Sequence, residues 1–334
     1  MWIAMAKIKS MIGCEFCTNE IRAVEITKNN DAYQILAMGY IPIERGVIEE
    51  GFIRDAERFQ GLFSELMSSG KFSSNNIAIG VNNENVMMRY AAFPKVDDDK
   101  LRNMVLLQAQ EFIPIPINEM EVDYVIADET TNEDNLAQYN IMLVAARKQM
   151  LEGYINHFNA MKYTVNDIDS SLLAFCRGIK DSSAGSEEKY CLVNFTDDIL
   201  SFIVVKGDKI LMVRSITIPD RNRAAVAELF GLNDIDEEDV DGKSEELIAN
   251  AKNFILSETS STVSYYSMQS EEQIEKIYLF ANCRYNDEIL KELQENIPIS
   301  VEFPQMYAKL QTADSTAVNN YAACIGVAIS ALEG

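Results

Sequence analysis

Few residues in this chain have the types and spacing that covalent or metal chemistry needs. His157 is the only histidine, so the sequence offers no multi-histidine metal site and no histidine base for a serine or cysteine nucleophile. Two of the six cysteines, Cys14 and Cys17, form a CxxC pair that lies in an apolar strand pattern with no second pair nearby. A zinc or thioredoxin-like site is the alternative, but we interpret the pair as small core residues.

One acidic tract has the composition of a calcium-binding loop. Residues 233–242 read Asn-Asp-Ile-Asp-Glu-Glu-Asp-Val-Asp-Gly, and their carboxylates are the kind of oxygen ligand that calcium prefers. However, the glycine does not fall at the sixth position behind alternating oxygen ligands, as the loop of an EF-hand requires. The tract therefore indicates a solvated loop.

The charge balance narrows the class of partner. The chain of 334 residues has 29 basic and 52 acidic residues, a net charge of −23. Such a surface repels phosphate backbones and anionic lipids, so it argues against nucleic-acid or direct membrane binding and favours a basic partner segment. No apolar run is long enough for a transmembrane helix, and the first ten residues lack the apolar region of a signal peptide. We therefore expect a cytoplasmic protein.

The segment from Leu106 to Tyr124 predicts a helix that stops abruptly. Its apolar periodicity ends at Phe112-Ile113, where Pro114 and Pro116 remove amide donors and force extended geometry. Strands are predicted afterwards at 121–126 and 139–146. These elements predict a small α/β subdomain inserted at about 84–162.

The remaining chain repeats one order of elements. The predicted strands lie at 11–17, 21–26, 33–40, 76–81, 190–195, 200–205, 209–216 and 276–281. The predicted helices lie at 56–69, 221–230, 245–269, 287–295 and 315–332. A polar divider at 180–188 separates the two halves. A hairpin, strand and helix order that occurs twice predicts an α/β protein with two related lobes around a cleft.

Several motifs in this order resemble the PilM family of type IV pilus machines. They are Gly13–Ile26, Gly46–Ile53, Glu111-Phe-Ile-Pro-Ile-Pro116, Leu143-Val-Ala-Ala-Arg147, Val263-Ser-Tyr-Tyr266 and Ile325-Gly-Val-Ala328. The resemblance implies an actin-like, FtsA-like ATPase fold. It also implies a first core subdomain at 1–83 with 163–189, the inserted subdomain at 84–162, and a second lobe at 190–334 with a helical and acidic insert at about 221–262.

The resemblance further implies a nucleotide with magnesium in the cleft, held by three glycine-containing loops. All three loops depart from the family pattern here, because the corresponding positions are Glu15, Cys17 and Thr18, then Asn194 and Thr196, then Ala281 and Asn282. Bare amides are lost and carboxylates are added where phosphates would lie, so we expect little or no binding of ATP. The alternative is that magnesium recruits the added carboxylates and the site stays active.

The family resemblance also implies a partner, because family members bind the short cytoplasmic tail of the membrane protein PilN in a groove between the first core subdomain and the inserted one. The candidate contact residues are Phe112, Ile113, Ile115, Tyr124 and Arg147, and the alternative is that they form only the core of that subdomain. We expect a non-enzymatic scaffold that links PilN to the assembly and retraction ATPases at the inner face of the cell membrane.

Two other functions are compatible with the same fold. The first is an active actin-like ATPase that switches its cleft in a pilus or type II secretion-like machine. The second is a polymer-forming FtsA relative, which the closing helix disfavours because it has no basic amphipathic face.

Overall fold

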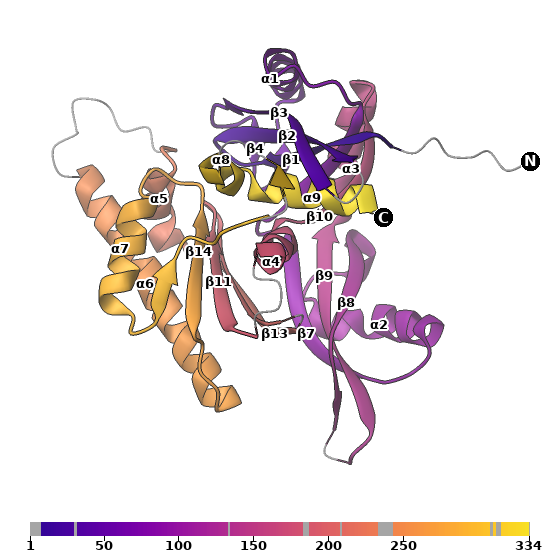
Figure 1. Ribbon diagram of the computed structural model, residues 1–334, viewed down its shortest axis with the longest axis vertical. Coiled ribbons are helices and arrows are strands. Elements are labelled where there is room, and N and C mark those ends of the chain that lie inside the picture. Colours follow the sequence, from indigo (N-terminus) through magenta and orange to yellow (C-terminus); the bar gives the residue numbers. More distant parts are fainter. Residues whose placement is uncertain are drawn as a thin grey trace, which may run out of the picture. The chain divides into compact units, whose positions relative to one another are not determined.

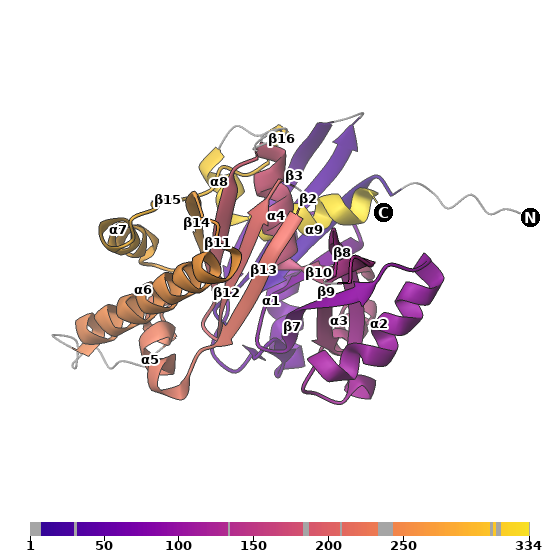
Figure 2. The same cartoon turned by 90° about the horizontal axis from the view of Figure 1, so that it is seen from below.

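The chain folds into two compact units (Figure 1 and Figure 2). The computed structural model describes residues 8–29, 32–132, 134–182, 187–207, 209–232, 243–307, 310–311 and 315–333. The first unit comprises Met1–Asn82, Leu151–Ala184 and Gln305–Gly334, and the second comprises Asn83–Met150 and Gly185–Pro304. The acidic tract 233–242 and residues 183–186 of the polar divider lie outside the described residues.

The first unit is built on a six-stranded sheet with the order β10-β6-β1-β2-β3-β16. Its strands are β1 (Ser10–Phe16), β2 (Glu20–Asn29), β3 (Ala32–Pro42), β6 (Asn76–Val81), β10 (Thr164–Ser170) and β16 (Leu310–Gln311). The first three form an antiparallel meander, whereas β6 pairs in parallel with both β1 and β10, and β16 pairs in parallel with β3. The other elements here are a hairpin, β4 (Ile48–Glu49) and β5 (Phe52–Ile53), and helices α1 (Ala56–Ser69), α3 (Lys148–Ala160), α4 (Ser171–Ser182), α8 (Ser315–Asn320) and α9 (Ala322–Glu333).

Helix α1 illustrates how local sequence positions the first sheet. The Asp55 carboxylate accepts a hydrogen bond from the amide of Arg58 at 2.9 Å, which caps the helix N-terminus. Phe59, Phe63, Leu66 and Met67 recur at helical spacing and are all buried. The Phe59 ring lies 5.6 Å from that of Phe16, the last residue of β1, so the helix fixes the end of this strand.

Helix α9 lies directly on β1 because both are made of small residues at the point of contact. A Cβ atom on Gly13 would lie 1.8 Å from the carbonyl oxygen of Cys324, so the two backbones touch. On the neighbouring strand, a Cβ atom on Gly80 would lie 2.8 Å from Ser171 Oγ and 3.4 Å from a methyl group of Val327. Only glycine fits at Gly13 without moving the helix backbone.

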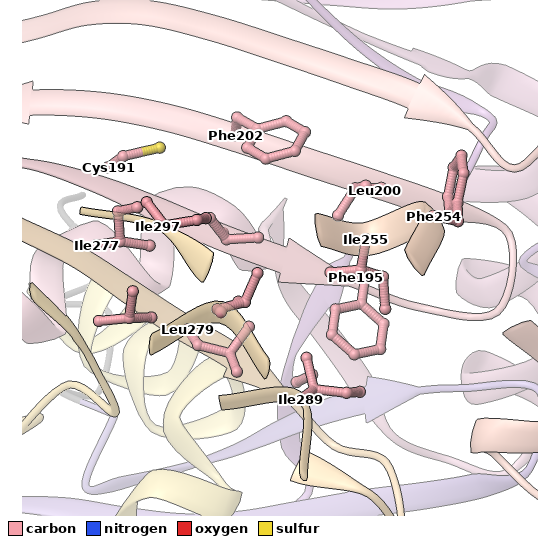
Figure 3. Packing of buried hydrophobic residues seen from close by; sticks show 14 of the residues in the cluster. Cys191, Phe195, Leu200, Phe202, Phe254, Ile255, Ile277, Leu279, Ile289 and Ile297 are labelled. Atoms are coloured by element: carbon pink, nitrogen blue, oxygen red, sulfur yellow. The ribbon is translucent and has the colours of Figure 1, made fainter. Parts of the chain in front are cut away.

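The second unit contains a five-stranded sheet with the order β13-β12-β11-β14-β15. Its strands are β11 (Lys189–Phe195), β12 (Ile199–Lys206), β13 (Lys209–Thr217), β14 (Lys276–Ala281) and β15 (Ser300–Glu302), and its helices are α5 (Asp220–Leu229), α6 (Lys243–Ser270) and α7 (Asn286–Asn296). One core joins the sheet to the helices: Phe195, Phe202 and Leu279 pack with Ile255 and Ile289 (Figure 3).

The inserted subdomain belongs to the second unit. It has a three-stranded antiparallel sheet of order β7-β9-β8, formed by β7 (Val86–Pro94), β9 (Ala137–Arg147) and β8 (Met120–Thr131). Helix α2 (Asp98–Phe112) covers one face of this sheet (Figure 1), and a 3-10 turn, η1 (Ile117–Glu119), leads into β8. The helix buries Leu101, Val105 and Ala109, which recur at helical spacing.

The α/β fold with several sheets confirms the predicted fold class, but the grouping of the chain differs from the predicted boundaries. The C-terminal helix α9 packs on β1 in the first unit, whereas the sequence boundaries placed 190–334 wholly in the second lobe. The inserted subdomain clusters with the second lobe rather than with the first core. The predicted closing helix 315–332 is two helices that part at Tyr321, and β7 was not predicted.

We expect Gly13→Ala to destabilise the protein by about 3 kcal/mol, because the added methyl group overlaps the backbone of α9. Gly61→Ala is the matched control: it lies in α1 with open space around its Cβ position, and should stabilise by roughly 0.5–1 kcal/mol. Urea unfolding of both variants measures the difference. Equal stability of the two variants would contradict the close contact.

Candidate functional site

The turn between β1 and β2 contains paired charges. Arg22 forms an ion pair with Glu20 at 2.5 Å and donates to the carbonyl oxygen of Asn320 at 2.7 Å. Burial raises the pKa of the Glu15 carboxyl above its usual range, although Arg22 acts in the opposite direction. The charge of Arg22 is thus already neutralised by Glu20, and Glu15 is a second carboxylate near the same guanidinium.

The same turn uses its own amides. The amide of Cys17 donates to the carbonyl oxygen of Glu20 at 3.0 Å, which closes the turn. Cys17 and Thr18 are half-buried. On the other side of the strand, the ring of Phe16 stacks on Tyr154 at 5.1 Å. An anion cradle needs free amides that point outward, and the amide of Cys17 is committed to its own turn.

The polar groups at the turn between β11 and β12 also form hydrogen bonds within the protein. The side-chain amide of Asn194 is buried and donates to the carbonyl oxygen of Phe280 at 2.8 Å, so it ties β11 to β14. Thr196 Oγ1 donates to Asp198 Oδ1 at 2.5 Å, and Asp198 Oδ2 accepts from the amide of Glu84 at 3.0 Å. Burial, followed by the neighbouring charge of Asp197, raises the pKa of Asp198 to about 6.

The loop after β14 lies beside this turn, because Phe195 and Ala281 are register partners in adjacent parallel strands. Ala281 is buried in the core of the second unit, and its carbonyl oxygen accepts from Asn286 Nδ2 at 2.6 Å. Asn282 is half-buried, and burial raises the pKa of the Cys283 thiol to about 12. The structure therefore brings together four of the predicted positions, namely Asn194, Thr196, Ala281 and Asn282.

These residues do not fit a magnesium nucleotide. The side-chain nitrogen of Asn194 faces a backbone carbonyl, the side chain of Ala281 is part of the core, and Asp197 and Asp198 add negative charge to the turn. Within the described ranges, no three His, Cys, Asp or Glu side chains gather as metal ligands.

The predicted partner-binding residues do come together, around the core of the inserted subdomain. Phe112, Ile115 and Tyr124 are half-buried and pack against that core, and the ring of Phe112 lies 6.0 Å from Phe93. Ile113 differs, because its side chain is 1% exposed and sits inside the core. Contact of a partner with Ile113 stays a prediction, and the structure places this side chain inward at the helix end.

Sequence reasoning missed two polar residues that hold this surface in place. The Gln110 side chain donates to the carbonyl oxygens of Ile113 and Ile115, at 3.1 and 3.3 Å, and accepts from the amide of Ile117 at 2.9 Å. It thus fixes the proline-containing turn. Asn85 Oδ1 accepts from Arg147 Nε at 2.9 Å. The sequence signal that could have indicated this role of Gln110 is its position four residues before Pro114.

Arg147 carries a second contact. Its Nη1 lies 3.4 Å from Glu119 Oε2, with the arginine side chain about one-third exposed. The guanidinium is therefore shared between an amide and a carboxylate of its own subdomain, although part of it still faces solvent.

No helix in the described part of the chain is long and apolar enough to cross a membrane.

Both the sequence and the fold of this chain match known proteins. The sequence model of the type IV pilus assembly protein PilM matches residues 13–329. A solved structure of a PilM–PilN type IV pilus biogenesis complex superposes with a TM-score of 0.82 at 18% identity, covering 98% of this chain and 100% of that chain.

Two more distant structures share only the fold. A protein with an actin-like ATPase fold and unknown function from Bacteroides thetaiotaomicron has a TM-score of 0.51 at 11% identity, covering 97% of this chain and 99% of that chain. The ethanolamine utilization protein EutJ from Carboxydothermus hydrogenoformans has a TM-score of 0.51 at 10% identity, covering 98% and 91%.

We expect Asp198→Asn to stabilise the protein at neutral pH. The folded pKa of about 6 lies above the usual 3.8, so the folded state binds this proton more tightly than the unfolded chain. The penalty of the buried charge is therefore present above pH 6 and is relieved as the pH falls towards 4. The uncharged amide should gain roughly 1–3 kcal/mol at about pH 7.5 and less at about pH 5.

Urea unfolding at the two pH values measures this gain, with Asp220→Asn as the control because its side chain is 99% exposed. An equal gain at both pH values would show that the charge of Asp198 is not the cause.

Proposed function

Because the chain belongs to the family of the type IV pilus assembly protein PilM, we propose that it is a non-enzymatic scaffold that holds the N-terminal tail of a PilN-like membrane protein. The observation that carries the proposal is the likeness to a PilM–PilN complex along the whole chain. The tail would bind at the apolar surface of the inserted subdomain and would keep the protein at the inner face of the membrane.

The surface around the proline turn has the properties that such a site needs. Phe112, Ile115 and Tyr124 present apolar area that is half-buried, and their backbones are fixed by a helix end, a turn and a strand. The turn is held by three hydrogen bonds of Gln110. A preorganised apolar surface loses little conformational freedom when an extended segment binds.

The negative charge of the protein favours a partner tail that is basic. With a net charge of −23, the protein attracts a segment that carries lysine or arginine next to its transmembrane helix. This attraction acts before contact and raises the rate of association, whereas the apolar surface sets the lifetime of the complex.

In this proposal the cleft has little or no role in ATP binding. The support is chemical: the amide of Cys17, the amide of Asn194 and the carboxylate of Asp198 are all used within the protein. The scaffold would then link PilN to the assembly ATPases by contact alone. The second candidate is an active ATPase in which magnesium recruits Asp197 and Asp198, and the presence of these carboxylates is the observation that favours it.

We expect no saturable heat when ATP with magnesium is titrated into the protein at micromolar concentration. Buried like charges next to the phosphates should weaken binding by several kcal/mol, which is more than a hundredfold in affinity. Isothermal titration calorimetry measures this directly. Micromolar binding with a stoichiometry near one would favour the second candidate.

We expect a synthetic peptide of the PilN-like tail to bind the same protein without nucleotide. Replacing both Ile115 and Tyr124 by alanine should weaken this binding by at least about tenfold, because both side chains leave the apolar surface. The matched control replaces Leu106 and Leu107 by alanine, since these are also exposed apolar residues of the subdomain. Circular dichroism checks that both variants fold, and equal affinities would refute this location of the site.

A further inference from the structure

The inserted subdomain is tied to the second lobe by polar contacts that no sequence motif indicates. The amide of Glu84 donates to Asp198 Oδ2 at 3.0 Å, and its carboxylate pairs with Arg223 of α5 at 3.5 Å. Further along, the hydroxyl of Tyr90 in β7 donates to the carbonyl oxygen of Ile210 in β13 at 3.1 Å. Segments that are about 120 residues apart in sequence are thus joined.

A fourth contact lies at the same boundary but is weaker. Lys209 Nζ lies 2.8 Å from Asp128 Oδ1, with the lysine side chain 56% exposed, so solvent screens this pair. The contact between Asp198 and Glu84 is less accessible to solvent, because both residues are half-buried and the Glu84 side chain is 21% exposed. A hydrogen bond from a backbone amide to a carboxylate in such a place is stronger than an exposed ion pair.

Asp198 is well oriented for this role. Thr196 Oγ1 holds one carboxylate oxygen at 2.5 Å, and the backbone carbonyl of Asp198 accepts from the amide of Ile218 at 2.8 Å. The other carboxylate oxygen is thereby aimed at Glu84, the second residue of the inserted segment. Asp198 thus contacts the subdomain at the point where its chain begins.

We propose that Asp198 is a positioning residue that fixes the inserted subdomain to the second lobe, so that the two move as one body. The chain connects this subdomain at both ends to the first unit, and yet its packing groups it with the second unit. The consequence for tail binding rests on the proposed function: a tail held by the inserted subdomain changes the dynamics of the second lobe.

Native-state hydrogen exchange tests the positioning role without any partner. In the unaltered protein, amides of β9 and of β11 should lose protection at the same urea concentration. In Asp198→Ala the Glu84 amide should exchange at least tenfold faster, and β9 should lose protection at a lower urea concentration than β11. Asp198→Asn keeps an acceptor oxygen, so β9 and β11 should again lose protection at one shared urea concentration, which at neutral pH is higher than in the unaltered protein.

The control variant is Asp97→Ala, which removes an exposed carboxylate of the same subdomain whose ion pair with Lys100 stays in that segment. It should leave both midpoints unchanged. Separate midpoints in the unaltered protein, or an unchanged Glu84 amide in Asp198→Ala, would overturn the proposal. A merely destabilised fold would shift β9 and β11 together, and this outcome would also count against it.

The consequence for the tail is tested by repeating the exchange with the synthetic tail peptide bound. Added protection should reach β11 in the unaltered protein and stop at the inserted subdomain in Asp198→Ala. If the peptide fails to bind, the proposed function fails while the partner-free result still decides the role of Asp198. Equal protection of β11 in both proteins would overturn the coupling.

Discussion

The contact between α9 and β1 is the constraint on which the first unit depends. The backbones meet at Gly13, where even a methyl group would overlap the carbonyl oxygen of Cys324. This contact joins the last helix of the chain to its first described strand, and so closes the sheet on one face. The same strand continues from Gly13 to Glu15 and Phe16 and leads into the turn at Cys17. Gly13 thus serves packing within the strand, four residues before Cys17, where the turn begins without a glycine.

The three candidate loops share one physical property, which is that their polar groups bond inward. The amide of Cys17 closes its own turn, and the side chain of Asn194 joins two strands. Asp198 bonds a threonine and the start of the inserted subdomain. A ligand that replaced these bonds would leave buried polar groups unpaired, which costs free energy for each group. The polar groups named here therefore contribute to holding the fold together.

The sequence predicted α1, β6 and β14 with the observed bounds, because clear apolar patterns and capping or turn residues enclose them. It also predicted the α/β class and placed the candidate contact residues in one subdomain. It did not predict β7, whose residues do not alternate cleanly. It left open whether Ile113 is a core or a contact residue, because the burial of Ile113 depends on how the proline turn is held. The sequence could not predict how the subdomains group, because the grouping depends on contacts between distant segments, such as that of Glu84 with Asp198.

The arrangement of the second unit bears on how the scaffold that we propose would transmit the binding of a tail. In a protein whose lobes are coupled by a ligand, occupancy of the cleft sets their relative freedom. Here the Asp198 carboxylate occupies the corresponding turn and bonds the subdomain that presents Phe112, Ile115 and Tyr124. In our proposal the coupling element is a side chain of the protein and is always present, so coupling would need no nucleotide cycle. What would vary is the occupancy of the apolar surface by a partner segment, and this occupancy would then change the dynamics of the second lobe.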